Sequence, residues 1–311
     1  MAKILVTPRS FAQYSDAPYQ NLEKAGIEVV RNPVGGILDK EQMLTHIKGM
    51  DGIIVGVDPL DKDVLAAGNL KVVSKYGVGT DNIDLDYCRE NGISVEKTLG
   101  ANSNAVADYT FALMLAVARK VVEIDRGCRA GDWGKKVAAD VFGKTIGVLG
   151  LGAIGRGVVA RAKGFSMKVL GYDIFRDDEY MTSNGVQFAG IDEMLAECDF
   201  ISLHMPLTKE TKHLINAGNL AKAKKSLVII NTARGGIINE DDLYNALKDG
   251  TILGAGVDVF EHEPAKESKL LELDNVVVGS HCAGSSAGAV EAMSEMAADN
   301  LIRAFKERGI I

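Results

Sequence analysis

The chain has 311 residues, of which 47% are hydrophobic and 25% are charged, an ordinary composition for soluble globular proteins. Its length favours two domains. The formal net charge of −7 argues against non-specific binding of nucleic acid, and no apolar run reaches the ~18 residues that a membrane span needs. The 4 cysteines and 5 histidines are dispersed, so we expect a cytoplasmic protein with reduced thiols and no metal site.

Short strands and helices alternate over the first hundred residues. Apolar runs predict strands at Lys3–Thr7, Glu28–Arg31, Gly52–Val55, Lys71–Lys75 and Ile93–Val95. Helical patterns fall between them, at Ala17–Ala25, Lys40–Ile47, Asp61–Ala67 and Leu85–Asn91. This alternation predicts a parallel sheet with helices on both faces.

A long apolar segment, residues 102–122, comes next and predicts a helix. A helix that is apolar over most of its circumference is usually buried between layers or subunits. We interpret this one as a bridge between two domains. The following residues, 123–143, are polar and irregular and contain Trp133, and we expect them to form an arm that could lie over a partner subunit.

Residues 145–173 carry the most informative motif of the chain. The run 146–151 predicts a buried strand, residues 154–164 a helix, and Lys168–Tyr172 a second strand that ends at Asp173. Between the first strand and the helix lies a G-x-G-x-x-G turn, whose glycines suit a tight turn, close approach of a pyrophosphate and close packing of the helix. Phosphates are favoured at a helix N-terminus, and an acidic residue ~20 positions further on suits the adenosine ribose. We predict a dinucleotide site; the alternative is a structural glycine-rich turn. The predicted residues are Gly150, Gly152, Ala153, Ile154, Gly155 and Asp173.

The second half continues the same alternation. Strands are predicted at Gln187–Phe188, Phe200–His204, Leu227–Asn231, Gly254–Val259 and Val276–Gly279. Helices are predicted at Ile191–Ala196, Asn219–Ala223 and Glu240–Lys248. A last helix over 285–308 has no strand after it, so we expect it to return to the first domain. The predicted domains are therefore 1–101 with 285–311, for the substrate, and 102–284, for the dinucleotide.

Three polar residues follow predicted strand ends in the second half: Arg234, Glu263 and His281. Ligands of open α/β sheets bind outside the carboxyl ends of the strands. Oxidation or reduction of a hydroxy acid needs a group that exchanges a proton, which histidine suits, and a nearby carboxylate favours its charged form. Arginine suits a substrate carboxylate because it binds in a bidentate manner. Each residue alone could be an ordinary loop residue.

Several blocks of sequence resemble one family. The chain is similar to the D-isomer-specific 2-hydroxyacid dehydrogenases, which include D-3-phosphoglycerate dehydrogenase, glycerate dehydrogenase and hydroxypyruvate reductase. The resemblance implies an α/β fold of two doubly wound parallel-sheet domains, in which a Rossmann NAD domain is inserted into a flavodoxin-like substrate domain. The matching blocks are 75–84 (KYGVGTDNID), 150–155 (GLGAIG), 203–208 (LHMPLT), 231–236 (NTARGG), 258–264 (DVFEHEP) and His281.

The resemblance also implies roles for single residues. Arg234 resembles the substrate-binding arginine of the family, His281 its acid/base, and Glu263 the carboxylate that pairs with that histidine. For the coenzyme, it implies that Asp258 contacts the nicotinamide amide, that Thr232 and Ala233 line the same side, and that His204 and Pro206 flank the adenosine. For the substrate, it implies that N–H groups of the Gly77–Gly79 loop, here those of Val78 and Gly79, bind the carboxylate. It also implies that Asn82 supports that loop.

Two positions depart from the family. Many phosphoglycerate dehydrogenases carry an arginine–serine pair after the third strand, where this chain reads Val55-Gly56-Val57-Asp58. Gly56 and Val57 can offer backbone N–H groups but no positive side chain, and Asp58 would repel a phosphate unless it points away. Cys282 stands where many relatives have an aliphatic residue, and we expect it to pack as a small apolar side chain.

The predicted function is that of an NAD-dependent D-2-hydroxyacid dehydrogenase which transfers a hydride between nicotinamide and C2 of a small acid, most similar to D-3-phosphoglycerate dehydrogenase. One alternative is a glyoxylate or hydroxypyruvate reductase, and another is a non-catalytic, NAD(H)-sensing protein of the corepressor type. Formate dehydrogenase is disfavoured because its histidine pairs with a glutamine. The resemblance also implies a homodimer.

Overall fold

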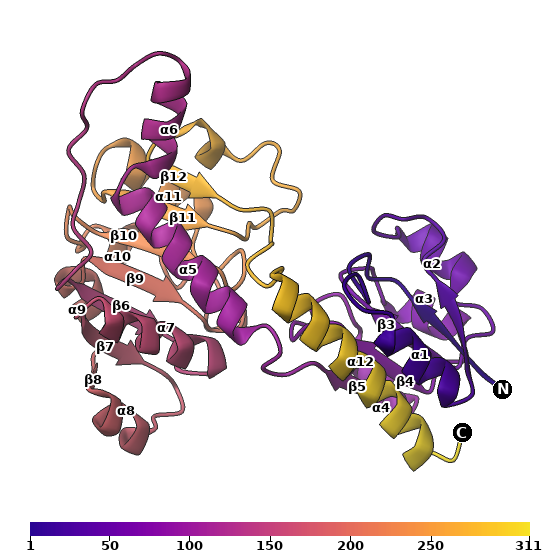
Figure 1. Ribbon diagram of the computed structural model, residues 1–311. Helices are drawn as coiled ribbons and strands as arrows, with labels where there is room; N and C mark the ends of the chain where they lie inside the picture. The colour runs from indigo at the N-terminus through magenta and orange to yellow at the C-terminus, as the bar shows by residue number, and fades with distance from the viewer. The chain divides into compact units, whose positions relative to one another are not determined.

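The chain folds into two compact units. The structure is a computed structural model that describes residues 1–311. Unit 1 comprises Met1–Asn102 and Ser285–Ile311, and unit 2 comprises Ser103–Gly284. Each unit contains one parallel sheet flanked by helices (Figure 1). The predicted fold class is therefore confirmed.

Unit 1 is built on a five-stranded parallel sheet with the order β2-β1-β3-β4-β5, which is the flavodoxin-like order. Its strands are β1 (Ala2–Val6), β2 (Ile27–Arg31), β3 (Gly52–Val55), β4 (Val72–Lys75) and β5 (Ser94–Lys97). Its helices are α1 (Ala17–Lys24), α2 (Lys40–His46), α3 (Lys62–Ala67), α4 (Leu85–Glu90) and α12 (Ala287–Glu307).

Helix α12 joins unit 1 although it follows unit 2 in the sequence. Its buried residues Leu301 and Phe305 belong to the same apolar cluster as Ile4 and Ile54 of the sheet. The Ser74 hydroxyl of β4 also donates to the backbone oxygen of Ala297 at 2.8 Å. Figure 1 shows this helix, in yellow, beside α1 and β4 from the first part of the chain.

Unit 2 is built on a seven-stranded parallel sheet with the order β12-β11-β10-β9-β6-β7-β8. This is the Rossmann order with one more strand at the edge, and the strand order reverses between β6 and β9. The strands are β6 (Thr145–Leu149), β7 (Lys168–Tyr172), β8 (Val186–Phe188), β9 (Phe200–Leu203), β10 (Val228–Asn231), β11 (Gly254–Val257) and β12 (Val276–Val278). The helices are α5 (Ser103–Ala118), α6 (Val121–Arg129), α7 (Ala153–Gly164), α8 (Asp178–Asn184), α9 (Ile191–Glu197), α10 (Ala217–Leu220) and α11 (Glu240–Lys248), with a 3₁₀ turn at Lys269–Glu272.

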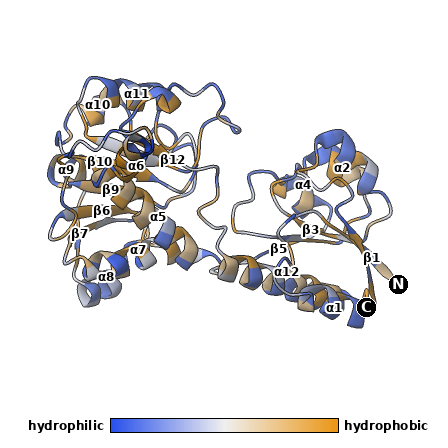
Figure 2. Ribbon diagram, turned by 45° about the horizontal axis from the view of Figure 1, so that its top comes forward, coloured by the Kyte–Doolittle hydropathy of each residue, from blue (hydrophilic) through white to orange (hydrophobic).

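The central strands are apolar on both faces because helices cover both sides of each sheet. Strands β9 and β10, for example, are buried along their whole length. Figure 2 shows these strands in orange, whereas the outer faces of the helices are blue. No helix in the chain has the length and apolar character needed to traverse a bilayer.

The apolar segment 102–122 differs from its prediction. The helix ends at Ala118, Lys120 adopts a left-handed conformation (φ 53°), and a second helix, α6, runs through residues that we expected to be irregular. Helix α5 belongs to unit 2, where it packs on β10, β11 and α7. Its apolar residues pack in the core of that unit, and its interpretation as a bridge between domains stays a prediction.

Helix α8 was absent from the prediction, although it has a clear start signal. The Asp177 side chain accepts a hydrogen bond from the Tyr180 N–H, and Asp178 and Glu179 occupy the first turn. Acidic residues at these positions stabilise a helix N-terminus. The helix also ends at Gly185, which is left-handed. Its seven residues were too few to give a convincing apolar period.

Candidate active site

The predicted site residues of unit 2 follow the carboxyl ends of its strands. Asp173 follows β7, His204 follows β9, Arg234 follows β10, and Asp258 follows β11. His281 lies beyond β12, the edge strand next to β11. Because all these strands are parallel, the residues lie along one edge of one sheet. The structure therefore places them where an open α/β sheet binds its ligands.

The turn between β6 and α7 requires its glycines. Gly150 has φ +96°, and a Cβ there would lie 2.6 Å from the His204 oxygen. A Cβ on Gly155 would lie 1.9 Å from the Gly150 oxygen. A larger side chain at either position would separate the turn from the helix or from β9.

The start of α7 fits a dinucleotide pyrophosphate. Gly152 is the N-cap residue and provides no side-chain cap, and the N–H groups of Gly152, Ala153 and Ile154 donate to no group of the protein. A Cβ on Gly152 would meet no atom within 4 Å, so the space over the turn is open. Free N–H groups at the N-terminus of a twelve-residue helix favour an anion. The residues present thus match the demands of the coenzyme.

The Asp173 carboxylate is fixed beside this turn. One oxygen accepts the Leu151 N–H at 2.6 Å and the other accepts the Phe175 N–H at 2.9 Å. Each carboxylate oxygen can accept a second hydrogen bond, so both remain available to ribose hydroxyls. The Arg176 guanidinium pairs with Asp178 and lies 4.6 Å from the Phe188 ring centroid. Because of these contacts, the Arg176 guanidinium already has partners and is less available to bind the 2′-phosphate of NADP.

His204 is a neutral, half-buried histidine. Its Nε2 atom lies 2.5 Å from the Ser202 hydroxyl, and its Nδ1 atom is buried without a hydrogen-bond partner. Burial lowers the pKa of His204 to about 3, because the charged ring would lose its hydration. Pro206, by contrast, is exposed, and its oxygen accepts the Thr211 hydroxyl at 2.7 Å. The predicted contacts of both residues with adenosine remain predictions.

The loop after β10 is held by its own side chains. The Asn231 amide donates to the Arg234 oxygen at 2.8 Å and accepts the Ala233 N–H at 3.0 Å. The buried Thr232 hydroxyl lies 2.9 Å from that of Thr110 on α5. The Arg234 guanidinium is half-buried, and its Nη1 donates to the Ala233 oxygen at 2.6 Å. The head group of Arg234 is thus ordered by the loop that carries it.

Arg234 lies close to the Glu263 loop because of a glycine. A Cβ on Gly235 would lie 1.9 Å from the Phe260 oxygen, so only glycine permits this approach of the two backbones. The guanidinium charge of Arg234 is one of the influences on the Glu263 carboxyl. The structure therefore brings together the two loops that carry the predicted arginine and glutamate.

The predicted acid/base pair is present. The His281 Nδ1 atom lies 2.8 Å from Glu263 Oε2, and Glu263 Oε1 accepts the Phe260 N–H at 3.0 Å. Burial acts to raise the pKa of the Glu263 carboxyl, but the hydrogen bonds from His281 and Phe260 and the charge of Arg234 outweigh it and hold the pKa below its ordinary value. The ionised glutamate fixes the proton on Nδ1, which leaves Nε2 for a substrate.

Asp258 has a structural task that the sequence did not reveal. Its carboxylate is 1% exposed, and its two oxygens accept the N–H groups of Cys282 at 3.0 Å and Ala283 at 2.8 Å. Its backbone oxygen accepts the His281 N–H at 2.8 Å, where His281 is left-handed (φ 58°). Asp258 therefore fixes the turn that presents His281. Its predicted contact with the nicotinamide amide remains a prediction.

Cys282 does not have the purely apolar surroundings that we expected. Its Sγ atom lies 3.3 Å from the Tyr109 hydroxyl and 3.6 Å from Asp258 Oδ1. The thiol is half-buried and can donate a weak hydrogen bond to either oxygen. Buried tyrosine hydroxyls usually need such a partner. Cys282 thus satisfies polar groups next to the His281 turn.

The predicted substrate loops of unit 1 follow β3 and β4. The N–H groups of Val57, Val78 and Gly79 donate to no group of the protein. The Gly56 N–H, however, donates to the Thr7 hydroxyl at 3.3 Å, so the expectation that it is free for a substrate was wrong. The chain binds its own hydroxyl there because β1 and β3 are neighbours in the sheet.

Asn82 and Asp58 also act differently from the simplest expectation. The Asn82 amide donates to the oxygens of Gly56 at 3.1 Å and Asp58 at 2.6 Å, so it supports the turn after β3 rather than only its own loop. The Asp58 side chain is 2% exposed and accepts hydrogen bonds from Thr7 and the Leu38 N–H. Its carboxylate therefore points into the protein and not toward an anion.

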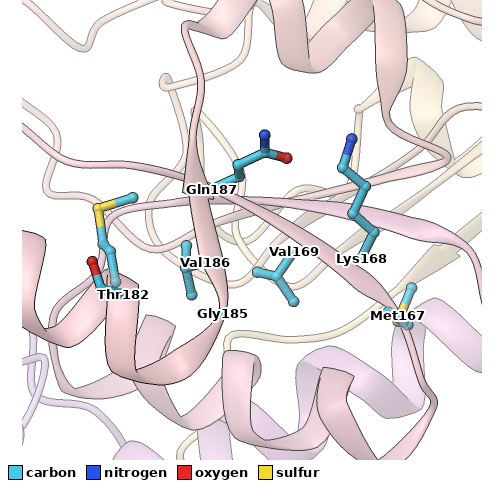
Figure 3. Close-up of a pocket in the computed structure, with 8 residues that line it drawn as sticks. Met167, Lys168, Val169, Thr182, Gly185, Val186 and Gln187 are labelled. Atoms are coloured by element: carbon cyan, nitrogen blue, oxygen red, sulfur yellow. The ribbon is translucent and has the colours of Figure 1, made fainter.

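One hollow of about 400 Å³ lies away from these residues. It is found at the amino ends of β7 and β8, beside the end of α8, whereas Asp173 lies at the carboxyl end of β7. Figure 3 shows the polar ends of Lys168 and Gln187 pointing to one side of it, with Val169 and Val186 below. No predicted site residue lines it, and it takes no part in the chemistry considered below.

Comparison with known proteins identifies the class. Residues 111–283 match the sequence model described as "D-isomer specific 2-hydroxyacid dehydrogenase, NAD binding domain". The chain belongs to this family. It is therefore an NAD-dependent oxidoreductase that acts on the CH–OH group of D-2-hydroxy acids, and the predictions of the enzyme class and of the coenzyme are confirmed. The non-catalytic alternative has no support from these relatives.

Individual relatives narrow the comparison. The chain is 43% identical to a glyoxylate reductase of Korarchaeum cryptofilum, over 86% of this chain and 83% of that protein. It is 40% identical to the D-3-phosphoglycerate dehydrogenase of Methanocaldococcus jannaschii, over 97% of this chain but 57% of that protein. A solved structure of D-lactate dehydrogenase from Aquifex aeolicus, complexed with NAD and lactic acid, matches this structure with a TM-score of 0.85. The two sequences are 30% identical, and the match covers 99% of this chain and 96% of the Aquifex chain. Three further similar proteins, from Pyrococcus horikoshii, Thermococcus onnurineus and Thermococcus litoralis, are also named glyoxylate reductase.

We predict that Asp173 sets a preference for NAD over NADP. Replacing it by alanine removes the hydrogen bonds to the ribose hydroxyls and the charge that repels a 2′-phosphate. Asp173→Ala should weaken NADH binding by roughly tenfold or more and narrow the NAD/NADP preference, as measured by fluorescence titration. Glu179→Ala removes the same charge from an exposed position on α8 and should leave the NADH affinity within about twofold. A parent protein that prefers NADPH would contradict the assignment.

Proposed function

We propose that the protein is an NAD-dependent reductase of a small, unphosphorylated 2-oxo acid such as glyoxylate or hydroxypyruvate. The turn after β3 supports this choice most directly. It offers the Val57 N–H and no cationic side chain, and Asp58 faces inward. A carboxylate can bind to such amides, whereas a doubly charged phosphate group would find no cationic side chain of residues 55–58 to contact there. The names of the similar glyoxylate reductases point the same way.

The two units have separate tasks in this proposal. Residues 102–284 bind the coenzyme through the β6–α7 turn and Asp173. Residues 1–101 with 285–311 bind the substrate through the amides of Val57, Val78 and Gly79, which lack internal partners. The division of the chain into two compact units supports this assignment of domains.

Arg234 would bind the carboxylate or the 2-oxo group of the substrate. The guanidinium is already ordered by the Ala233 oxygen, so little conformational entropy is lost when it binds. Its planar donors match a carboxylate or the oxygen of a 2-oxo group. The positive charge also stabilises the negative charge that develops on that oxygen during reduction.

His281 would act as the general acid of the reduction. The β6–α7 turn and Asp173 would hold the NADH that provides the hydride for C2. His281 holds its proton on Nε2, because Nδ1 is engaged by Glu263, and passes it to the developing alkoxide. Before this transfer, Glu263 stabilises the positive charge of the imidazolium. It also keeps the ring in one orientation. In the opposite direction the neutral ring accepts the proton of the hydroxyl group.

A D-3-phosphoglycerate dehydrogenase is the second candidate, and one observation favours it. The relative with that name matches 97% of this chain. The experiment that separates the two is an NADH-oxidation assay of the purified protein with glyoxylate, hydroxypyruvate and 3-phosphohydroxypyruvate at equal concentrations. The proposal expects the highest kcat/KM with an unphosphorylated acid. A clear preference for the phosphorylated acid would overturn it and restore the first prediction.

Arg234 is predicted to control substrate capture. Arg234→Ala deletes one partner of a charged pair, which costs on the order of 2–5 kcal/mol, so kcat/KM should fall by roughly thirtyfold or more. Arg234→Lys should recover only part of this loss because it lacks the planar fork. NADH affinity should be nearly unchanged in both variants. Unaltered KM and kcat values in Arg234→Ala would remove this residue from the site.

The pH profile is predicted to report the Glu263–His281 pair. Reduction needs the protonated ring, so its rate falls as pH rises, whereas oxidation needs the neutral ring and rises over the same range. Glu263→Gln removes the negative partner of the imidazolium, so the pH profile of reduction should differ from that of the parent, with its falling limb at lower pH. Glu263 has a lowered pKa, so it is ionised throughout this range.

Glu261→Gln is the matched control for that profile. Glu261 also pairs with a histidine, because its Oε1 lies 3.2 Å from His213 Nε2, but it has no proposed catalytic task. The Glu261→Gln profile should overlay that of the parent. If the Glu263→Gln profile overlays it as well, the paired acid/base mechanism fails.

We also propose that the protein is a homodimer. Residues 130–140 contain no helix or strand and run along the outside of unit 2 (Figure 1). Trp133 and Val137 are 81% and 92% exposed, and Phe142 just beyond is 71% exposed. Such apolar side chains on an extended arm need a covering surface. Sedimentation at micromolar concentration should give a dimer, and Trp133→Ser with Val137→Ser should shift it toward monomer. A monomeric parent protein would contradict the proposal.

A further inference from the structure

A buried ammonium group holds the turn after β3. Lys75 is the last residue of β4 and is only 5% exposed. Its Nζ atom donates to the Gly56 oxygen and to Asn82 Oδ1, the latter at 3.0 Å. The Asn82 amide donates to the same Gly56 oxygen at 3.1 Å. One carbonyl group therefore accepts two donors, of which one carries a full positive charge.

The other side of this peptide faces outward. The C=O and N–H of a trans peptide point in opposite directions because the unit is planar. The two donors on the Gly56 oxygen therefore fix the direction of the Val57 N–H. That N–H donates to no group of the protein, and Val57 is 58% exposed. The Thr7 hydroxyl accepts the Gly56 N–H at 3.3 Å, which restrains the turn from its other end.

The charge of Lys75 acts on this N–H through the peptide. A hydrogen bond to a charged donor polarises a carbonyl group, and polarisation passes along a chain of hydrogen bonds. A buried charge is screened by solvent less than an exposed one. The negative charge of Asp58, which is also buried, is directed toward Thr7 and the Leu38 N–H. The turn thus has a positive charge behind the peptide and an unpaired donor in front of it.

We propose that Lys75 is a positioning residue for anion recognition, which aims and polarises the Val57 N–H toward the carboxylate of the substrate. This inference rests on the proposed function. It gives the turn a positive charge from the neighbouring strand, although residues 55–58 carry no cationic side chain. Lys75 need not touch the substrate, because it acts from behind the Gly56–Val57 peptide. It favours a compact acid that presents one carboxylate group to this turn, since only one amide there carries the effect.

Four variants test the inference in the NADH-bound enzyme. Lys75→Met removes the charge and the hydrogen bonds, Lys75→Gln keeps a donor without the charge, and Lys75→Arg keeps the charge. Lys71→Met is the control, since Lys71 is an exposed lysine that donates only to Asn69. KM and kcat are measured with glyoxylate, together with the inhibition constant of oxalate as an unreactive anion and the Kd of NADH.

The expected result is a split between binding and turnover. In Lys75→Met and Lys75→Gln, KM for glyoxylate and the inhibition constant of oxalate should rise together by about tenfold. The kcat and the Kd of NADH should stay within about threefold, and Lys75→Arg should recover most of the KM. A residue that merely stabilises the fold would lower kcat and NADH affinity as well, and would give no such split.

Either of two outcomes overturns the inference: unchanged KM and oxalate inhibition in the folded Met and Gln variants, or a parallel loss of kcat and NADH binding. If those variants do not fold, the inference is tested on the parent protein by NMR. The ¹⁵N–¹H resonance of Val57 must then move when oxalate is added to the NADH complex, and a resonance that stays fixed refutes the proposal. A parent protein with no 2-oxo acid reduction would instead refute the proposed function, whatever the variants do.

Discussion

The arrangement at the carboxyl edge of unit 2 depends on the buried carboxylate of Asp258. Three backbone N–H groups of the turn 281–283 donate to this one residue, two to its side chain and one to its backbone oxygen. They hold His281 in a left-handed conformation that few non-glycine residues adopt. In that conformation the ring meets Glu263, whose own loop approaches Arg234 at Gly235. The three residues that we regard as catalytic are therefore positioned by backbone contacts as much as by their own pairing.

The two units solve the problem of anion binding in related ways. In unit 2 the free N–H groups at the start of α7 await a pyrophosphate, and a helix dipole assists them. In unit 1 the free N–H groups after the strands do not belong to a helix, so no helix dipole assists them. At one of these groups, the Val57 N–H, we infer that the positive charge of Lys75 has this role instead. Both solutions use the main chain as the donor, which leaves cationic side chains for the reacting end of the substrate.

The sequence predicted the architecture well because periodicity and glycine spacing are local signals. The strand after residue 145, the turn at Gly150 and the return of the last helix all followed from pattern and chain order. Short helices were harder: α8 has few residues, and α6 follows a break at Lys120 that no proline or glycine marks. Long-range pairing was harder still, since neither the Thr7 hydroxyl on the Gly56 N–H nor the Cys282 contact with Tyr109 leaves a trace in the local sequence. The functional roles came from family resemblance, and they stay predictions until they are measured.

Helix α12 also imposes an order on the synthesis of the chain. The sheet of unit 1 is complete at β5, yet its apolar face at Ile4 and Ile54, which α1 covers in part, is fully covered only when Phe305 has emerged from the ribosome. At about 5–20 residues per second, the intervening ~200 residues take roughly 10–40 seconds to translate. Unit 2 is continuous in sequence and is free to fold during that interval, whereas unit 1 waits with an exposed apolar surface. Nascent chains of this protein are therefore most exposed to aggregation before their last helix appears, and a chaperone that shields the unit 1 sheet would act in that interval.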